Sequence, residues 1–119
     1  MFFNKINPFA KNHNGKYFEL LAVMDGMYCV GFVSLYGHSD TEISCGPEIK
    51  PQYRNQGLAY QAVIQALEYT KRNGYTKAVA QVRTDNFSSI ALHKKLDFHT
   101  CKEYTNKKGN PVIWFEKDL

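Results

Sequence analysis

The sequence predicts one α/β (α+β) domain whose mixed, mostly antiparallel central sheet is built around a strand–helix–strand core. Three observations support this prediction. Two strand-like runs flank Asp25-Gly26, a dipeptide typical of hairpin turns. A helical pattern at residues 57–73 is followed directly by another strand-like run, which requires a crossover connection. The chain has 119 residues, 44% of them hydrophobic, which matches a single globular domain over residues 1–119.

The first half of the chain is predicted to consist of strands. Residues 1–16 mix phenylalanine with asparagine, lysine and proline, and we expect them to be irregular. Strands follow at 16–24 and 27–36, which are rich in aromatic, valine and leucine residues. A third strand at 41–49 contains Gly46-Pro47. Because proline has no N–H to donate to a sheet, this dipeptide predicts a bulge or a local break in pairing.

The second half is predicted to alternate helices and strands. Small and apolar residues recur at three-and-four spacing from 57 to 73, and Gly74 ends this first helix. The later elements are a parallel strand at 75–83, a second helix at 87–96 capped by Asp85 or Asn86 and ended by Asp97, and a closing hairpin of strands at 99–104 and 111–117.

Composition and charge exclude several classes of protein. The net charge is +4, from 15 basic and 11 acidic residues scattered along the chain, so no nucleic-acid partner is expected. No apolar run reaches the roughly 18–20 residues of a membrane span. Residues 1–16 also lack the apolar core of a secretory signal. We therefore expect a cytoplasmic protein without a membrane partner.

The cysteines and histidines predict neither disulfides nor a metal cofactor. Cys29, Cys45 and Cys101 form no close pair, and each lies in a strand-like run, so we expect reduced thiols packed in the sheet. Three histidines lack the spacing of metal ligands and are interpreted as surface or turn residues: His13, His38 and His99.

The most informative segment is the loop Arg54-Asn55-Gln56-Gly57-Leu58-Ala59, between the third strand and the first helix. The first N–H groups of a helix have no partner within it, and the helix dipole adds positive potential there. Gly57 lets an anion approach the backbone, Ala59 keeps the first turn small, and Arg54 supplies a cation. The pattern predicts a phosphate-binding loop, although it is neither a P-loop nor a G-x-G-x-x-G motif.

A second block follows one strand later and contains Asn86, Ser89, Leu92-His93 and Leu96-Asp97-Phe98. Together the two blocks resemble the GNAT N-acetyltransferase superfamily, in which a Q/R-x-x-G-x-G/A loop holds the pyrophosphate of acetyl-CoA. The resemblance covers residues 41–98 well, while the flanking hairpins match in order only and the usual N-terminal helices have no counterpart. It implies these cofactor-binding residues: Ile49, Arg54, Asn55, Gln56, Gly57, Leu58, Ala59, Tyr60, Asn86 and Ser89.

The resemblance implies acetyl-CoA as cosubstrate. Its acetyl group would pass to a primary amine of a small molecule, peptide or protein by direct attack on the thioester. The strands at 41–49 and 75–83 would splay apart to admit the pantetheine arm, which would contact the Ile49 backbone and Asn86. The amides of residues 56–60 would bind the pyrophosphate.

Three groups are candidates for the chemistry. A lysine-type amine titrates near ~10.4, so a side chain or a water chain must take its proton. Glu42 or Glu48 could do so, and the resemblance favours Glu42. A free N–H of residues 46–49 could stabilise the oxyanion. His93 stands where the family often has the tyrosine that protonates the coenzyme thiolate. An imidazole titrating near ~6.5 could donate or accept that proton.

Alternatives remain open at this point. The short N-terminus implies an acceptor site that is open to a peptide amine or completed by a partner subunit, and strand edges near Phe2, Phe3 and Phe9 suggest a homodimer. A second function is a non-catalytic acyl-CoA-binding or interaction module on the same fold. A third, a β-rich nucleic-acid binder, rests only on the charge and the aromatic content.

Overall fold

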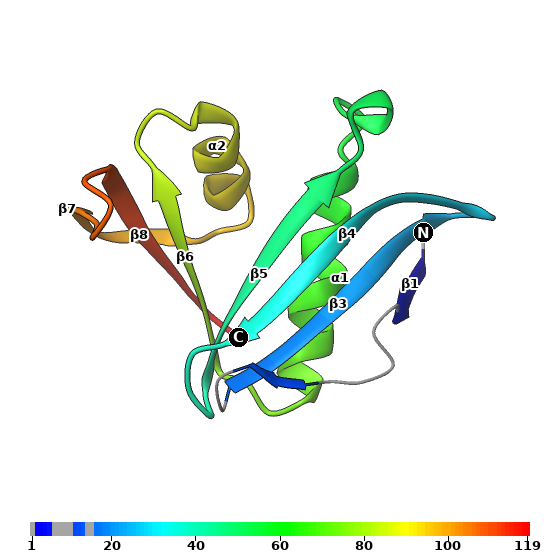
Figure 1. Ribbon diagram of the computed structural model, residues 1–119, viewed down its shortest axis with the longest axis horizontal. Helices are drawn as coiled ribbons and strands as arrows, with labels where there is room; N and C mark the ends of the chain where they lie inside the picture. The colour runs from blue at the N-terminus through cyan, green and yellow to red at the C-terminus, as the bar shows by residue number, and fades with distance from the viewer. Residues whose placement is uncertain (1, 6–10, 14–15) are drawn as a thin grey trace.

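The computed structural model describes residues 2–5, 11–13 and 16–119, with side chains from residue 18 onward. An eight-stranded sheet carries two α-helices, which confirms the predicted mixed α/β architecture (Figure 1). The strands are β1 (Phe2–Lys5), β2 (Lys11–His13), β3 (Lys16–Asp25), β4 (Tyr28–Gly37), β5 (Glu42–Ile49), β6 (Lys77–Arg83), β7 (His99–Thr105) and β8 (Pro111–Asp118). The helices are α1 (Leu58–Arg72) and α2 (Phe87–Lys95), and a 3-10 turn spans Pro51–Tyr53. The sheet order is β1-β3-β4-β5-β6-β8-β7, and β2 also pairs with β3.

The N-terminal segment differs from the prediction of irregular structure. Both β1 and β2 pair antiparallel with β3 and extend the edge of the sheet. An edge strand of ten residues offers unpaired N–H and C=O groups, and pairing with it satisfies the backbone of a segment that has no alternating pattern of its own. Phe9 lies outside the described residues, and the side chains of Phe2 and Phe3 lie outside the described side chains.

The predicted first hairpin is present, with its turn one position later than expected. Asp25 pairs with Tyr28, so Gly26 and Met27 form the turn between β3 and β4. Gly26 has a φ of +60°, a conformation that glycine adopts without strain. The turn therefore starts at the glycine and not at the aspartate.

Both helices lie on one face of the sheet, because Val63 and Leu67 of α1 share an apolar cluster with Leu96 at the end of α2. Their bounds match the predicted ones to within one residue. In Figure 1, α1 lies behind β3, β4 and β5. Its Ala62 and Ala66 pack into the apolar cluster of these strands. Its Val63 and Leu67 belong to a second cluster, which includes residues of β6 and β8 and the end of α2. Helical three-and-four spacing thus lets α1 serve both halves of the core.

The start and end of α2 follow the predicted local signals. The Asn86 side chain caps the helix by accepting a hydrogen bond from the Ser89 N–H at 3.2 Å. Asp97 adopts the left-handed conformation, with a φ of +66°, directly after the helix. Because β8 lies between β6 and β7, α2 crosses over it to reach the closing hairpin. Neither helix, over the part of the chain that is described, has the length and apolarity to cross a membrane.

β5 and β6 pair only where they begin. Their parallel ladder contains two residue pairs, Glu42 with Lys77 and Ile43 with Ala78. Beyond these pairs the two strands diverge and form a V in Figure 1. The predicted splay of these strands is therefore present, and the parallel pairing is as predicted.

The predicted interruption at Gly46-Pro47 is wrong for the β4 side of β5, where the ladder runs without a break. Two hydrogen bonds bracket this ladder: Lys50 N–H donates to the Val30 carbonyl at 2.9 Å, and His38 N–H donates to the Glu42 carbonyl at 2.8 Å. Bonded pairs alternate along an antiparallel ladder. The even-numbered residues of β5 therefore bond to β4, and the odd-numbered ones direct their N–H and C=O groups toward the V.

This alternation explains why a proline is tolerated in the middle of the strand. Pro47 is odd-numbered, so its missing N–H lies on the side where β6 has already diverged, and no ladder bond is lost. The neighbouring odd residues, Cys45 and Ile49, keep N–H groups that face the V. The break in pairing therefore lies between β5 and β6 and not between β5 and β4.

Candidate functional site

A cleft of about 620 Å³ opens where the end of β5, the start of α1 and the start of α2 meet. We call it the α1 cleft. Nine of the ten predicted cofactor-binding residues line it, and Gln56 does not. The nine are Ile49, Arg54, Asn55, Gly57, Leu58, Ala59, Tyr60, Asn86 and Ser89. Segments that are distant in sequence are thus brought to one cavity.

The first turn of α1 faces this cleft with free donors. Gly57 is the N-cap residue in a left-handed conformation, with a φ of +74°, and no side chain caps the helix. The first helical bond runs from the Gln61 N–H to the Gly57 carbonyl, so the N–H groups of Leu58, Ala59 and Tyr60 have no partner within the helix. Since the first turn has no acidic residue, this end of α1 carries net positive potential that favours an anion.

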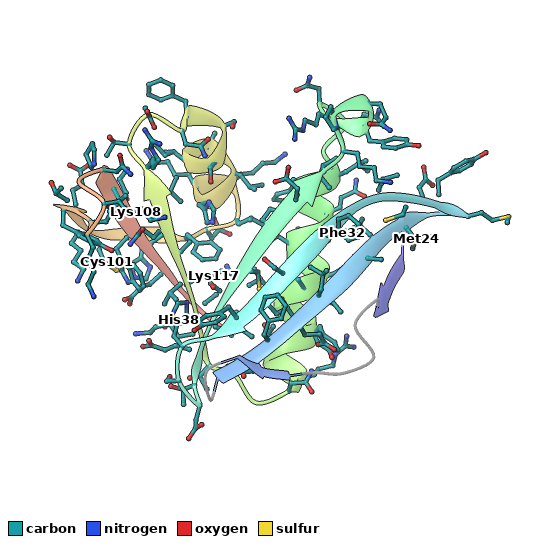
Figure 2. The ribbon with its side chains drawn as sticks, viewed as in Figure 1. Met24, Phe32, His38, Cys101, Lys108 and Lys117 are labelled. Carbon is teal, nitrogen blue, oxygen red and sulfur yellow. The ribbon has the colours of Figure 1, made fainter. Side chains whose placement is uncertain are left out.

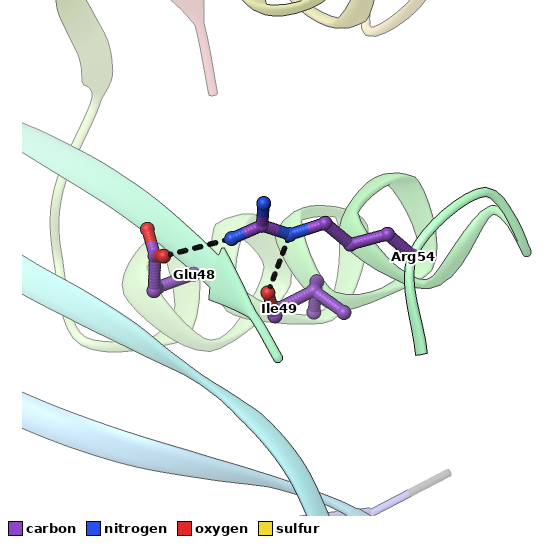
Figure 3. Close-up of polar contacts among 3 residues, drawn as sticks. All are labelled: Glu48, Ile49 and Arg54. Carbon is purple, nitrogen blue, oxygen red and sulfur yellow. Dashed lines mark hydrogen bonds and ion pairs between the residues drawn. The ribbon is translucent and has the colours of Figure 1, made fainter. Parts of the chain in front are cut away.

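Arg54 is anchored at the rim of the cleft (Figure 3). Its Nε donates to the Ile49 carbonyl at 2.9 Å, and its guanidinium forms an ion pair with Glu48 at 3.2 Å. Both side chains are more than half exposed, so the ion pair itself adds little stability. The contact fixes a cation beside the cleft and occupies one backbone oxygen at the end of β5.

Lys95 is a second cation at the cleft, and the sequence reasoning missed it. It comes from the last turn of α2, and its Nζ lies 4.3 Å from the centroid of the Tyr60 ring on α1. A cation over an aromatic face is held there by the ring's quadrupole. Only the packing of α2 beside α1 brings Lys95 to the cleft, so no local motif signals it.

A second cavity of about 500 Å³ lies between the diverging β5 and β6, and we call it the splay cavity. Pro47 and Ser89 line both cavities, which therefore adjoin. On α2, the splay cavity is lined by Ser89 and His93. The free N–H groups of α1 and the opening of the V thus lie in neighbouring cavities.

His93 is buried and held in one orientation. Its Nδ1 lies 2.7 Å from the Ser89 carbonyl, an acceptor, so Nδ1 carries the proton. The ring stacks on Phe115 at 5.5 Å and meets the edge of Phe98 at 5.0 Å between centroids. Burial lowers the pKa of His93 below its ordinary value, and the Ser89 hydrogen bond opposes this only partly. At neutral pH the ring is therefore uncharged, with Nε2 as its hydrogen-bond acceptor.

This pKa predicts a loss of stability on acidification. The unfolded chain gains a proton on His93 near pH 6.5, whereas the folded protein gains it only at lower pH. The contribution of His93 is therefore complete above this value and is lost as the pH falls through the folded pKa. Lowering the pH from about 7.5 to about 5.5 should reduce the free energy of unfolding more in wild type than in His93→Phe, as measured by chemical denaturation. Equal losses in both proteins would contradict the prediction.

The structure separates the two predicted glutamates from His93. Glu48 lines the α1 cleft and is paired with Arg54. Glu42 lies at the closed end of the V, where β5 pairs with β6, and lines neither cavity. Of the side chains from residue 18 onward, those that line the splay cavity include no carboxylate.

Two residues that sequence reasoning did not assign to a site do line the splay cavity: His38 and Ser44. His38 lies in the bend after β4, as interpreted, but it is half-buried there. Figure 2 shows it at the lower end of β4. The β4–β5 pairing brings it beside Ser44 on the next strand, a contact that spacing along the chain does not reveal.

One further group of side chains has the composition of a metal site. His99, Cys101 and Glu116 place ligand atoms within 4.8 Å of one another at the β7–β8 edge. Both carboxylate oxygens of Glu116 already have donors, Lys77 at 3.2 Å and the Trp114 indole at 2.9 Å. These contacts hold the pKa of Glu116 below its usual value. The three side chains therefore form a polar cluster in which both carboxylate oxygens of Glu116 already accept hydrogen bonds.

Comparison with protein families matches residues 1–99 to the acetyltransferase (GNAT) domain. No curated protein sequence matches the chain.

Solved structures show the same fold. A ribosomal-protein-alanine N-acetyltransferase from Brucella melitensis has a TM-score of 0.75 at 19% identity, over 86% of this chain and 69% of that one. A GNAT family acetyltransferase from Elizabethkingia anophelis, with acetyl-CoA bound, has a TM-score of 0.74 at 15% identity, over 86% and 76%. A spermidine N-acetyltransferase chimera from Vibrio cholerae and hSSAT has a TM-score of 0.77 at 17% identity, over 85% and 69%.

Proposed function

Because the chain belongs to the GNAT acetyltransferase family, we propose that it transfers the acetyl group of acetyl-CoA to a primary amine by direct attack on the thioester. The observation that carries the proposal is the adjoining pair of cavities, which links the free N–H groups of α1 to His93. The acceptor is a small molecule or a peptide. The names of two structural relatives, an alanine N-acetyltransferase of a ribosomal protein and a spermidine N-acetyltransferase, support an amine acceptor.

The α1 cleft would hold the coenzyme end of the cosubstrate. The N–H groups of residues 56–60 would bind the diphosphate, and Arg54 and Lys95 would balance its charge. Asn86 and Ser89 would flank the pantetheine arm at the start of α2. The N–H and C=O groups of Cys45 and Ile49 face the V and offer bonds to the amides of that arm.

The transfer step needs donors for the oxyanion of the tetrahedral intermediate. Gly46 and Glu48 are even-numbered, so their N–H groups are used in the β4 ladder. Pro47 has none. Within residues 46–49 this leaves the Ile49 N–H. The Cys45 N–H faces the same side two bonding positions earlier, with Pro47 between them.

For the two glutamates we propose supporting roles. Glu48 would keep the Arg54 guanidinium at the rim of the α1 cleft through their ion pair. Glu42 would act through its backbone, because its carbonyl accepts hydrogen bonds from the N–H groups of His38 and Ser39. It thereby shapes the bend that carries His38.

The proposed function is tested in two stages. Acetyl-CoA at 100 times its dissociation constant should stabilise the protein by about 2.7 kcal/mol. Incubation with a panel of amines should then release free thiol from acetyl-CoA. Stabilisation without thiol release would favour the alternative of a non-catalytic acyl-CoA-binding module. Salt-dependent stabilisation by oligonucleotides, with none by acetyl-CoA, would instead indicate a nucleic-acid binder.

Cys45 lines the splay cavity, so an acetyl-cysteine intermediate must be tested. Packing against both apolar clusters raises the pKa of its thiol to about 12, which keeps it protonated and weakly nucleophilic. We therefore expect Cys45→Ala to keep thiol release from acetyl-CoA within a few-fold of wild type. An inactive but folded Cys45→Ala protein, or acetyl-cysteine seen by mass spectrometry, would contradict direct transfer.

His93→Phe is expected to lower turnover while leaving acetyl-CoA affinity unchanged within about twofold, since general acid–base groups contribute to the reaction step more than to binding. The aromatic ring preserves the stacking against Phe115 but removes Nε2 from the splay cavity. Turnover and thermal stabilisation by acetyl-CoA should be measured on the same preparation. An unchanged rate constant would remove His93 from the mechanism.

A further inference from the structure

We propose that Ser44 and His38 together accept the proton of the attacking amine. The inference rests on the proposed acetyl transfer and names the group that supplies its base. His38 Nε2 and Ser44 Oγ lie 3.1 Å apart, within hydrogen-bond distance, and both residues line the splay cavity. In the tautomer that carries its proton on Nδ1, His38 accepts a hydrogen bond from the serine hydroxyl.

The surroundings of His38 fix the orientation of its ring. The rings of Tyr36 and Trp114 meet it edge-on, with centroid distances of 5.2 and 6.4 Å. Its backbone is held in the bend by the 2.8 Å bond from its N–H to the Glu42 carbonyl. Both side-chain and backbone contacts therefore keep Nε2 directed at Ser44.

The position of the pair suits the acceptor side of the reaction. Ser44 and His38 belong to the β4–β5 side of the cavity, while His93 belongs to α2. In a tetrahedral intermediate the attacking nitrogen and the leaving sulfur occupy different corners, so each can be served by a different wall. The α2 wall that carries His93 thus faces the sulfur, and the Ser44–His38 pair faces the nitrogen.

The residues that line the splay cavity also favour an imidazole as the base. The thirteen residues that line it, within the described part of the chain, include no Asp, Glu, Lys or Arg. A cationic amine is disfavoured in such surroundings, which lowers its pKa and brings it closer to that of an imidazole. Among the side chains that the structure describes, titratable groups near His38 include Tyr36 on β4, Cys45 on β5, His93 on α2, and Glu116 on β8, which bonds to the Trp114 indole beside His38.

The proton transfers balance. As the new C–N bond forms, the nitrogen loses one proton to Ser44 Oγ, and the original hydroxyl proton passes to His38 Nε2. The C–S bond then breaks, and the coenzyme sulfur leaves as a thiolate that takes a proton from solvent, because the neutral His93 carries its one ring proton on Nδ1, bound to the Ser89 carbonyl. After product release the His38 imidazolium gives its proton to solvent, which restores the pair.

The test compares kcat/KM as a function of pH in wild type, His38→Gln, Ser44→Ala and His99→Gln, using the best amine of the panel. We expect wild-type kcat/KM to fall on acidification through one ionisation, as the base becomes protonated. His38→Gln should fall about 100-fold and lose this ionisation, and Ser44→Ala should fall about tenfold. His99→Gln, a histidine replaced outside both cavities, should match wild type. Stabilisation by acetyl-CoA should be equal in all four proteins.

The outcomes separate the two proposals. If His38→Gln keeps the wild-type rate and pH profile, the role of the pair is overturned while the acetyltransferase proposal stands. If wild type binds acetyl-CoA but releases no thiol with any amine, both proposals fail. If His38→Gln does not fold, Ser44→Ala decides, because a wild-type rate in that variant would also overturn the inference.

Discussion

Replacing Ala59 with glutamate is expected to weaken acetyl-CoA binding about 100-fold without destabilising the protein. Ala59 is in the first turn of α1 and lines the α1 cleft. A carboxylate about 6 Å from one phosphate charge, at an effective dielectric constant of about 20, costs about 2.8 kcal/mol, which corresponds to roughly 100-fold in affinity. The same carboxylate interacts favourably with the helix dipole. Ala59→Glu should therefore lower the affinity for acetyl-CoA without lowering the melting temperature.

The matched control is Gln61→Glu. Gln61 is exposed and lies on α1 two residues later, but it does not line the α1 cleft. The substitution adds the same charge near the same helix end, but outside the cleft, where solvent screens it. We therefore expect the acetyl-CoA affinity of Gln61→Glu to stay within about threefold of wild type. Isothermal titration and thermal unfolding give both quantities. Equal affinities for Ala59→Glu and Gln61→Glu would place the diphosphate elsewhere.

Gly31→Ala is expected to reduce the free energy of unfolding by about 3 kcal/mol, at the upper end of the range for overpacked sites. A Cβ atom at Gly31 would overlap the Glu48 carbonyl oxygen and lie 2.9 Å from the Ile49 Cα. Both neighbours are backbone atoms of β5, so no side-chain rotation relieves the clash. Strand β5 would have to move at the end that borders the α1 cleft.

Gly46→Ala serves as the control for this prediction. It lies in the same strand pair, but its Cβ would meet only the Ser34 Oγ, at 3.0 Å, and a serine side chain can rotate. Urea denaturation should show a much smaller loss of stability for Gly46→Ala than for Gly31→Ala. Equal losses would mean that the close approach of β4 and β5 is not the cause.

Features encoded by neighbouring residues could be predicted from the sequence. The helix at 58–72 and the Asn86 cap depend on spacing and local hydrogen bonds, and the structure has both. The residues at the α1 cleft were found because loop and helix start are contiguous. By contrast, the pairing of β1 with β3 depends on a long-range backbone match that leaves no side-chain pattern.

Site residues that depend on packing between elements could not be predicted. Lys95 reaches the α1 cleft because α2 packs beside Tyr60. His38 meets Ser44 because of the β4–β5 register. The family resemblance favours Glu42 as a base, yet Glu42 lies at the closed end of the V and lines neither cavity. Distances of this kind follow from three-dimensional packing and not from sequence spacing.

Pro47 also limits what else can enter the V. An internal strand edge without a partner is a template onto which another extended chain can add, which leads to aggregation or domain swapping. Since Pro47 offers no donor there, an invading peptide strand would face a gap in its hydrogen bonding midway along β5. A slender ligand with widely separated amides does not need that donor. The proline therefore disfavours the pairing of another extended backbone with this edge of β5.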